Sequence, residues 1–191
     1  MYCTIADLKA YLGITGTGDD LLLYDCIQRA QALIERRTGR VFEVTVSTTH
    51  YFDALAEVCG STLWFDDDCC SITTVTNGDA DSTVITSAYY TTKPVNSTPY
   101  YAITLKGSSG YSWQYVNDPE NAIQVSGKWG YSATPPEDIV QACVRLAAYL
   151  YRQKDQQVIE SMVTEQGIIT VQPGLPKDIE ELLRPYKRRI K

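Results

Sequence analysis

The side chain best suited to acid–base chemistry in this sequence is His50, the only histidine in the chain. A Ser/His/Asp or Cys/His arrangement would have to depend on it alone. His50 lies in the strand-like pattern of residues 48–52, and no partner for it is obvious in the sequence. An ordinary strand histidine is therefore favoured over a general base, and we predict no catalytic residue.

The next candidate is the run Asp66-Asp67-Asp68-Cys69-Cys70, which could suggest a metal site. Calcium loops alternate their ligands and use a glycine and a distal glutamate. Zinc sites usually place about two to four residues between paired cysteines. The run fits neither pattern, so we interpret it as a turn between two strands. We predict no metal and no cofactor.

The C-terminal segment is the best candidate for binding a partner. Residues 182–189 combine an apolar anchor, a tyrosine and a cationic cluster, and residues 184–191 hold five basic residues and no acidic one. Arginine and tyrosine are favoured in the energetic centres of protein interfaces. A docking segment is therefore favoured over a solvated basic tail.

The remaining charge limits the possible partners. The net charge is −6, and residues 41–131 carry ten acidic and three basic residues. An acidic body does not suit wrapping nucleic acid, which needs a basic face. It suits a surface that repels DNA, while the basic tail suits an acidic partner. No apolar run approaches the roughly 20 residues that span a bilayer, and the N-terminus has no signal-peptide pattern. We therefore expect no membrane contact and assembly in a cytoplasm.

Two stretches of helical character are separated by a strand-rich middle. Thr4 and Asp7 form a capping box for a helix that stops at Gly13. A longer helix is expected between Asp19 or Asp20 and Gly39, with its apolar residues at helical spacing. Further on, Thr134 is the expected N-cap of another helix.

The stretch after this helix is expected to contain a hairpin and a short helix. Residues 158–163 and 168–171 could pair as a hairpin across residues 165–167. Pro176 opens the short helix, which should bend or end at Pro185 because proline lacks the backbone donor.

The middle zone alternates with period two and predicts about six short strands. They cover residues 41–51, 63–65, 72–76, 83–85, 100–105 and 123–125, and Asn77-Gly78 is a strong turn signal. We predict an α+β fold in which a helical bundle shell, residues 4–40 and 134–190, carries an inserted antiparallel β subdomain. The expected domains are a helical core of residues 1–40 and 132–191 and a β-rich insertion of residues 41–131.

Four blocks in chain order resemble the head-tail connector (adaptor) proteins of tailed phages and prophages. They are residues 4–14 with the acidic pair 19–20 and the helix ending at 37–40; residues 71–79; residues 127–131 with 135–139; and residues 175–179 continuing through 183–189. Compact members of that family are almost entirely helical, whereas this chain has an insertion of about ninety residues whose role stays open.

The resemblance implies a non-enzymatic structural subunit. It implies a ring of identical subunits, usually twelve, that lies beneath the portal protein and continues the DNA channel. DNA would pass without specific binding, and the protein would reside in the neck of the virion after assembly in the host cytoplasm. Carried over to this sequence, the portal contact would comprise Ile179, Leu182, Leu183, Arg184, Pro185, Tyr186, Lys187, Arg188 and Arg189.

Three alternatives remain open. The chain could be a stopper or tail-completion protein of the same neck, which would bind the adaptor or the tail tube. A ligand-binding or enzymatic module could reside in the β insertion around His50 and residues 66–68. A nucleic-acid binder would have only the C-terminal tail in its favour.

Overall fold

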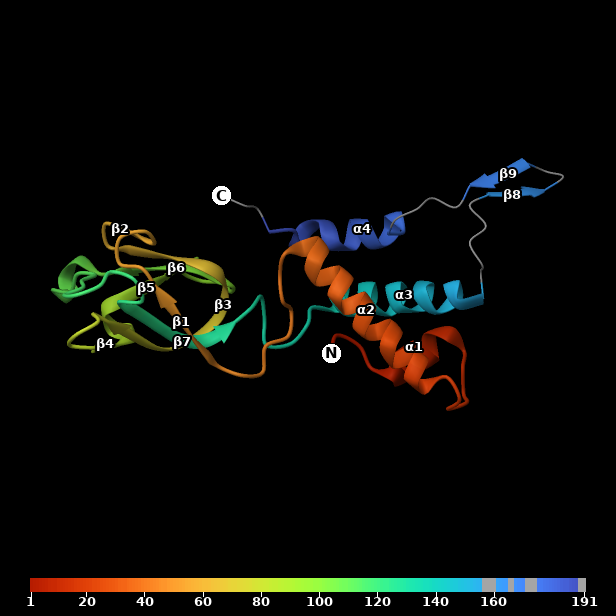
Figure 1. Ribbon diagram of the computed structural model, residues 1–191, viewed down its shortest axis with the longest axis horizontal. Helices are drawn as coiled ribbons and strands as arrows, with labels where there is room; N and C mark the ends of the chain where they lie inside the picture. The colour runs from red at the N-terminus through yellow and green to blue at the C-terminus, as the bar shows by residue number, and fades with distance from the viewer. Residues whose placement is uncertain (156–160, 165–166, 171–174, 189–191) are drawn as a thin grey trace. The chain divides into compact units, whose positions relative to one another are not determined.

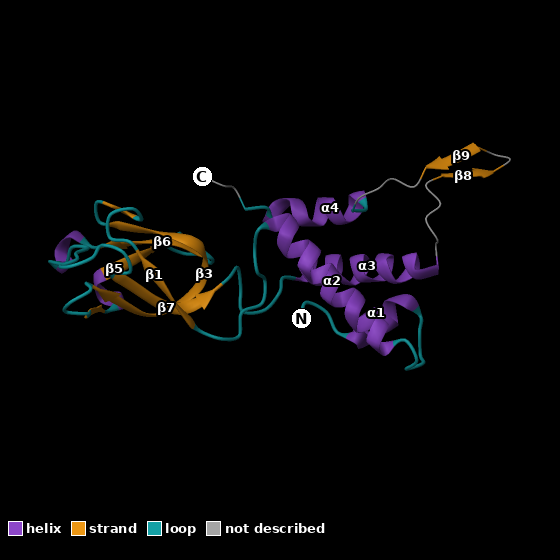
Figure 2. Ribbon diagram, viewed as in Figure 1, coloured by secondary structure: helices purple, strands orange, loops and turns teal. Residues whose placement is uncertain are grey.

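The chain is described by a computed structural model that covers residues 1–155, 161–164, 167–170 and 175–188. It divides into two compact units. Unit 1 comprises Met1–Arg40 and Pro135–Lys191, and unit 2 comprises Val41–Thr134. The helices α1 to α4 lie in unit 1 and the seven-stranded sheet lies in unit 2 (Figures 1 and 2). The predicted α+β class is confirmed. No helix in the described ranges is long and apolar enough to cross a bilayer.

The capping residues of helices α1 (Ile5–Leu12) and α2 (Asp20–Thr38) account for most of their boundaries. The Thr4 side chain accepts a hydrogen bond from the Asp7 amide, and the Asp7 carboxylate accepts one from the Thr4 amide, so the predicted capping box is confirmed. Gly13 and Gly39 close the two helices in the left-handed region, at φ 72° and 67°. At the start of α2, the Tyr151 hydroxyl and then Lys154 lower the pKa of Asp19.

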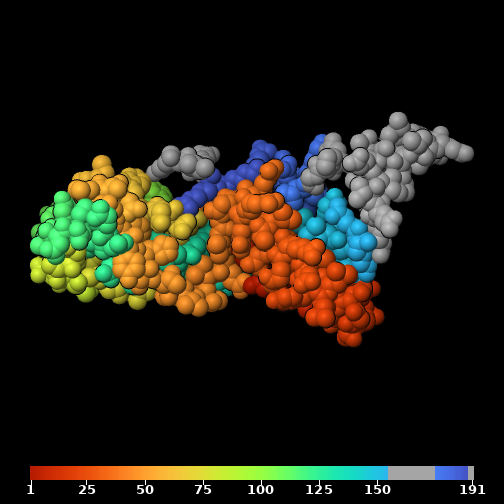
Figure 3. All heavy atoms as spheres, in the orientation of Figure 1, coloured from red at the N-terminus to blue at the C-terminus, as the bar shows by residue number. Residues whose placement is uncertain are grey.

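Helix α3 (Glu137–Arg152) is the central element of unit 1. Its N-cap is Pro136 and makes no side-chain hydrogen bond, so the N-cap predicted at Thr134 is wrong. Proline at 135 and 136 favours extended backbone before the helix, which delays its start. The buried residues of α3 contact α1, α2 and α4. Figure 3 shows the red and orange atoms of the N-terminal segment beside the blue atoms of the C-terminal segment, in agreement with the contacts of α3 with α1 and α2.

After α3, strands β8 (Ser161–Thr164) and β9 (Gly167–Thr170) pair antiparallel. This pairing confirms the predicted hairpin, except for residues 158–160, 165–166 and 171, which lie outside the described ranges. Helix α4 (Lys177–Leu183) follows, and a single 3-10 turn, η4, covers Arg184–Tyr186. The helix therefore ends next to Pro185, as predicted.

Unit 2 is an antiparallel sheet of order β1-β7-β3-β6-β5, with β2 and β4 also paired to β3. Its core gathers apolar side chains from most of these strands. The strand bounds are β1 Thr48–Phe52, β2 Val58–Cys59, β3 Thr62–Asn77, β4 Thr83–Ile85, β5 Tyr90–Lys93, β6 Tyr100–Leu105 and β7 Ile123–Trp129. Strands β4 and β6 match the predicted ranges, whereas β2 and β5 were not predicted.

The long strand β3 overturns one prediction. Residues 66–70, predicted to form a turn between two strands, lie inside β3, where the register with β6 shifts between Trp64 and Cys69. A β-bulge bends a strand without ending it. This bulge leaves Asp66 and Asp67 exposed and buries Asp68, because it breaks the simple alternation of faces that a regular strand has.

Two polar residues at the end of β3 hold a long loop against the sheet. The buried Asn77 side chain donates to Ser112 O (2.8 Å) and accepts from the Gln114 amide (3.2 Å). Asp79 accepts from the backbone amides of Val116, Asn117 and Asp118. These hydrogen bonds hold the pKa of the Asp79 carboxyl below its ordinary value, and the bond from the Val116 amide has the largest effect.

Candidate partner-docking surface

Helix α4 is anchored in unit 1 by two apolar side chains. Ile179 and Leu183 are four residues apart, so they project from the same face of the helix. Both are fully buried where α4 contacts α3 and α2. Burial of a Leu or Ile side chain stabilises a fold by about 1.5–3 kcal/mol. In this structure both side chains therefore belong to the core of unit 1 rather than to an exposed surface.

Polar contacts fix the orientation of α4 on the neighbouring helices. Arg145 of α3 donates to Asp178 at 2.9 Å, and Arg37 of α2 pairs with Glu180. The Tyr186 hydroxyl donates to Asp138 at 3.3 Å. Exposed pairs of this kind contribute little energy each. Their value here is geometric, because they tie α4 to both α2 and α3 and so define where the chain leaves the helix.

The residues after α4 run along the C-terminal end of α2. The Arg188 amide donates to Thr38 O at 2.8 Å, which satisfies one of the carbonyls that a helix end leaves unpaired. The last turn of α2 carries Arg36 and Arg37. Two cationic segments far apart in the sequence therefore gather at one helix end, whose partial negative charge favours them. We call Arg36, Arg37, Arg184, Lys187 and Arg188 the basic edge.

The other predicted docking residues differ in exposure. Arg184, Pro185 and Lys187 are exposed, whereas Leu182, Tyr186 and Arg188 are half-buried. Arg184 donates to the Glu181 carboxylate at 3.0 Å. Arg189 lies outside the described residues. Sequence reasoning missed Arg36 and Arg37 as members of this surface, because only the contact between α2 and α4 brings them to it.

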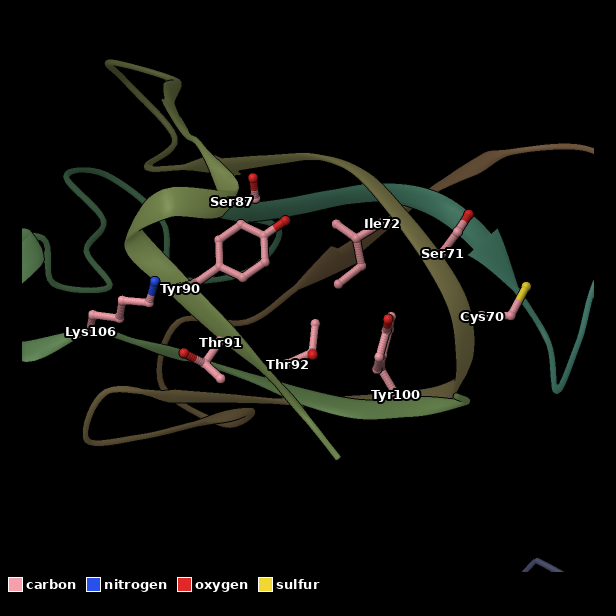
Figure 4. A pocket seen from close by; sticks show the side chains of 9 residues that line it. All are labelled: Cys70, Ser71, Ile72, Ser87, Tyr90, Thr91, Thr92, Tyr100 and Lys106. Carbon is pink, nitrogen blue, oxygen red and sulfur yellow. The ribbon is translucent and has the colours of Figure 1, made fainter. Parts of the chain in front are cut away.

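Unit 2 has a hollow of about 460 Å³ between β3, β5 and β6 (Figure 4). Its lining is hydroxyl-rich and includes Tyr90, Tyr100 and Lys106. Lys106 Nζ donates to Ala88 O at 2.8 Å, and burial raises the pKa of the Cys70 thiol. None of the nine lining residues is a carboxylate or a histidine, so the lining supplies neither of these general bases.

His50 has a partner that the sequence did not reveal. Its ring stacks on Trp129, with centroids 4.0 Å apart and an interplanar angle of 8°. His50 Nδ1 lies 3.7 Å from Asp66 Oδ1. Strand β1 supplies the histidine and the bulge of β3 supplies the carboxylate. The structure thus brings together two features that the sequence presented separately.

Comparisons with known proteins agree over almost the whole chain. The family model described as "Head completion protein" matches residues 2–189. The chain resembles a subunit in the neck of an empty gene transfer agent (GTA) particle computed with C6 symmetry, at 17% identity and a TM-score of 0.63. It also resembles a subunit in the neck of the native particle computed with C12 symmetry, at 16% identity and a TM-score of 0.58. Each likeness covers 98% of this chain and 90% of the other chain. No curated protein sequence matches the chain.

Proposed function

We propose a structural role in a head–tail neck, because the chain belongs to the head completion protein family. This membership confirms the resemblance to phage head–tail neck proteins. The chain is a structural component of such a neck and has no enzymatic role. More specifically, it is an adaptor subunit that forms a ring beneath the portal protein and joins the capsid to the tail. The symmetric GTA necks that share its fold support a ring, and twelve copies would satisfy both sixfold and twelvefold symmetry.

The observation that carries the adaptor proposal is the way α4 is held. Its buried face fixes the helix on unit 1, and the C-terminal members of the basic edge, Arg184, Lys187 and Arg188, follow the helix directly. The proposed portal contact then consists of the exposed Arg184, Pro185 and Lys187 and the half-buried Leu182, Tyr186 and Arg188, with Arg189 next along the chain. Ile179 and Leu183 support that contact from inside the fold.

The rest of the surface fits a DNA channel. Unit 2 contains residues 41–131, which have seven more acidic than basic residues. Like charge repels the phosphate backbone, so DNA would pass the ring without binding to it. The neck of a virion, assembled in the host cell, is the proposed location.

Charge reversal tests the portal contact better than deletion does. Removing residues 176–191 would uncover the core that Ile179 and Leu183 fill, so lost binding could reflect misfolding. The variant Arg184→Glu/Lys187→Glu leaves that core intact. Disrupting a buried interfacial charge pair typically costs about 2–5 kcal/mol. We expect this variant to bind the cognate portal at least about tenfold more weakly in a co-sedimentation assay.

The matched control is Arg29→Glu/Arg152→Glu, which reverses two exposed charges on α2 and α3. It should bind the portal like the unsubstituted protein. Equal binding by both double variants would contradict the assignment of the basic edge.

A stopper or tail-completion protein of the same neck is the second candidate, because the description of the family, head completion protein, fits it as well as it fits an adaptor. It predicts binding to an assembled adaptor or to the tail tube, with no binding to the bare portal. The same co-sedimentation assay, run with each component separately, distinguishes the two functions.

A further inference from the structure

The bulge in β3 carries two exposed carboxylates to the side chain of the chain's single histidine. One ligand atom from each of His50, Asp66 and Asp67 lies within 4.8 Å of the other two. The sequence analysis named His50 and residues 66–68 together only as an open alternative, because nothing in the sequence shows that side chains sixteen positions apart lie close together. The proximity arises from the bend in β3 and from the position of β1 at the edge of the sheet.

We propose that His50, Asp66 and Asp67 form a binding site for a divalent transition-metal ion of the zinc type. Zn²⁺ binds imidazole nitrogen and carboxylate oxygen at about 2.0–2.2 Å, so neighbouring ligands of a tetrahedral ion stand about 3.4 Å apart. His50 Nδ1 and Asp66 Oδ1 are 3.7 Å apart. Asp66 and Asp67 are exposed, and small side-chain rotations can close the remaining separation.

The histidine is already held in place for this role. His50 is fixed in β1 by its pairing with Val125 of β7, and its ring lies flat against Trp129. The Trp129 indole in turn donates to Thr48 O at 3.1 Å. A ligand whose ring is oriented before the ion arrives loses little conformational freedom on binding.

The ligand chemistry selects the class of ion. An imidazole nitrogen suits zinc, copper and nickel, whereas magnesium and calcium prefer an all-oxygen shell. A neutral imidazole and two carboxylates supply two negative charges, which balance a dication. Three protein ligands leave a fourth position open to water. The bound ion would tie the edge strand β1 to the bulge of β3, and because it binds the folded state it would stabilise unit 2.

Titration of the full chain with Zn²⁺ tests the proposal by calorimetry and NMR. The single histidine gives one set of imidazole resonances, so its response is unambiguous. We expect saturable binding of one Zn²⁺ per chain and a shift of the His50 ring nitrogen resonances. Loss of a protein ligand, in His50→Gln or in Asp67→Asn, should weaken binding by about tenfold or more.

The control variant is Asp81→Asn, which removes an exposed carboxylate elsewhere in unit 2 and should bind Zn²⁺ unchanged. Tryptophan fluorescence checks that each variant keeps unit 2 folded, since all three tryptophans lie there. The proposal is overturned if no saturable binding occurs at millimolar Zn²⁺. It is also overturned if all variants bind equally, which would place the ion on other ligands such as the thiols. The proposal is likewise overturned if Mg²⁺ binds as tightly as Zn²⁺ and the His50 resonances do not shift, because the histidine would then not be a ligand.

Discussion

Leu183 offers the sharpest test of how α4 is held. Its side chain is 0% exposed, while Leu182, the preceding residue on the same helix, is half-buried. Leu183→Ala removes three carbons, worth about 0.8 kcal/mol each in lost transfer free energy, or about 2.4 kcal/mol together. The cavity left behind adds to this, so measured Leu→Ala costs at such sites reach about 3–5 kcal/mol. Leu182→Ala should cost about 1 kcal/mol, because only part of that side chain leaves water on folding.

The two units can be followed separately in one denaturant titration. Trp64, Trp113 and Trp129 all lie in unit 2, so tryptophan fluorescence reports its unfolding. Helices α1 to α4 lie in unit 1, so far-ultraviolet circular dichroism chiefly reports unit 1. Leu183→Ala should lower the midpoint of the dichroism transition and leave the fluorescence transition in place. The reasoning is refuted if Leu182→Ala and Leu183→Ala shift the dichroism transition equally.

Three further predictions concern unit 2. A Cβ on Gly127 would lie 2.2 Å from Ser71 O, so Gly127→Ala should destabilise the unit by about 2 kcal/mol or more in the fluorescence transition; Gly107→Ala, with open space around it, should change it little. The pKa of Asp79 is lowered by backbone amides, so its contribution to stability is present above the ordinary aspartate pKa of about 4 and is lost as the pH falls below that value. The NMR shifts of the Val116, Asn117 and Asp118 amides should therefore stay constant down to well below pH 4, and a titration near pH 4 would contradict this. Burial raises the pKa of the Cys69 thiol to about 12, whereas Cys59 is exposed, so mass spectrometry of the native protein after brief alkylation at neutral pH should find Cys59 modified and Cys69 unmodified.

Helix boundaries set by local chemistry were predictable from the sequence. The capping box at Thr4 and Asp7 and the terminal glycines Gly13 and Gly39 act over one turn, so the local sequence contains the whole signal. The N-cap predicted at Thr134 was wrong because it also depended on local sequence alone. Its pattern fits an N-cap, but the prolines that follow hold the backbone extended through Pro136.

The strand errors have a different cause. Strand β3 runs through three aspartates that have low strand propensity, because pairing with β6 and β7 on either side of the bulge outweighs local preference. Strands β2 and β5 are short and lie against β3 and β6, so tertiary pairing rather than composition defines them.

The candidate sites were predictable only in part. Composition alone singled out the C-terminal segment, and the resemblance added Ile179 and Leu183 to the expected portal contact. Neither showed that both residues are buried within unit 1, nor that the segment joins Arg36 and Arg37 at the end of α2. The cluster of His50 with Asp66 and Asp67 depends on a bulge in β3 that the local sequence does not predict.

The most direct test of the neck function is electron microscopy of the purified chain mixed with its cognate portal protein. We expect a closed ring on one face of the portal, with Arg184 and Lys187 at the contact. Portal particles without added density, or rings that bind only tail components, would contradict it.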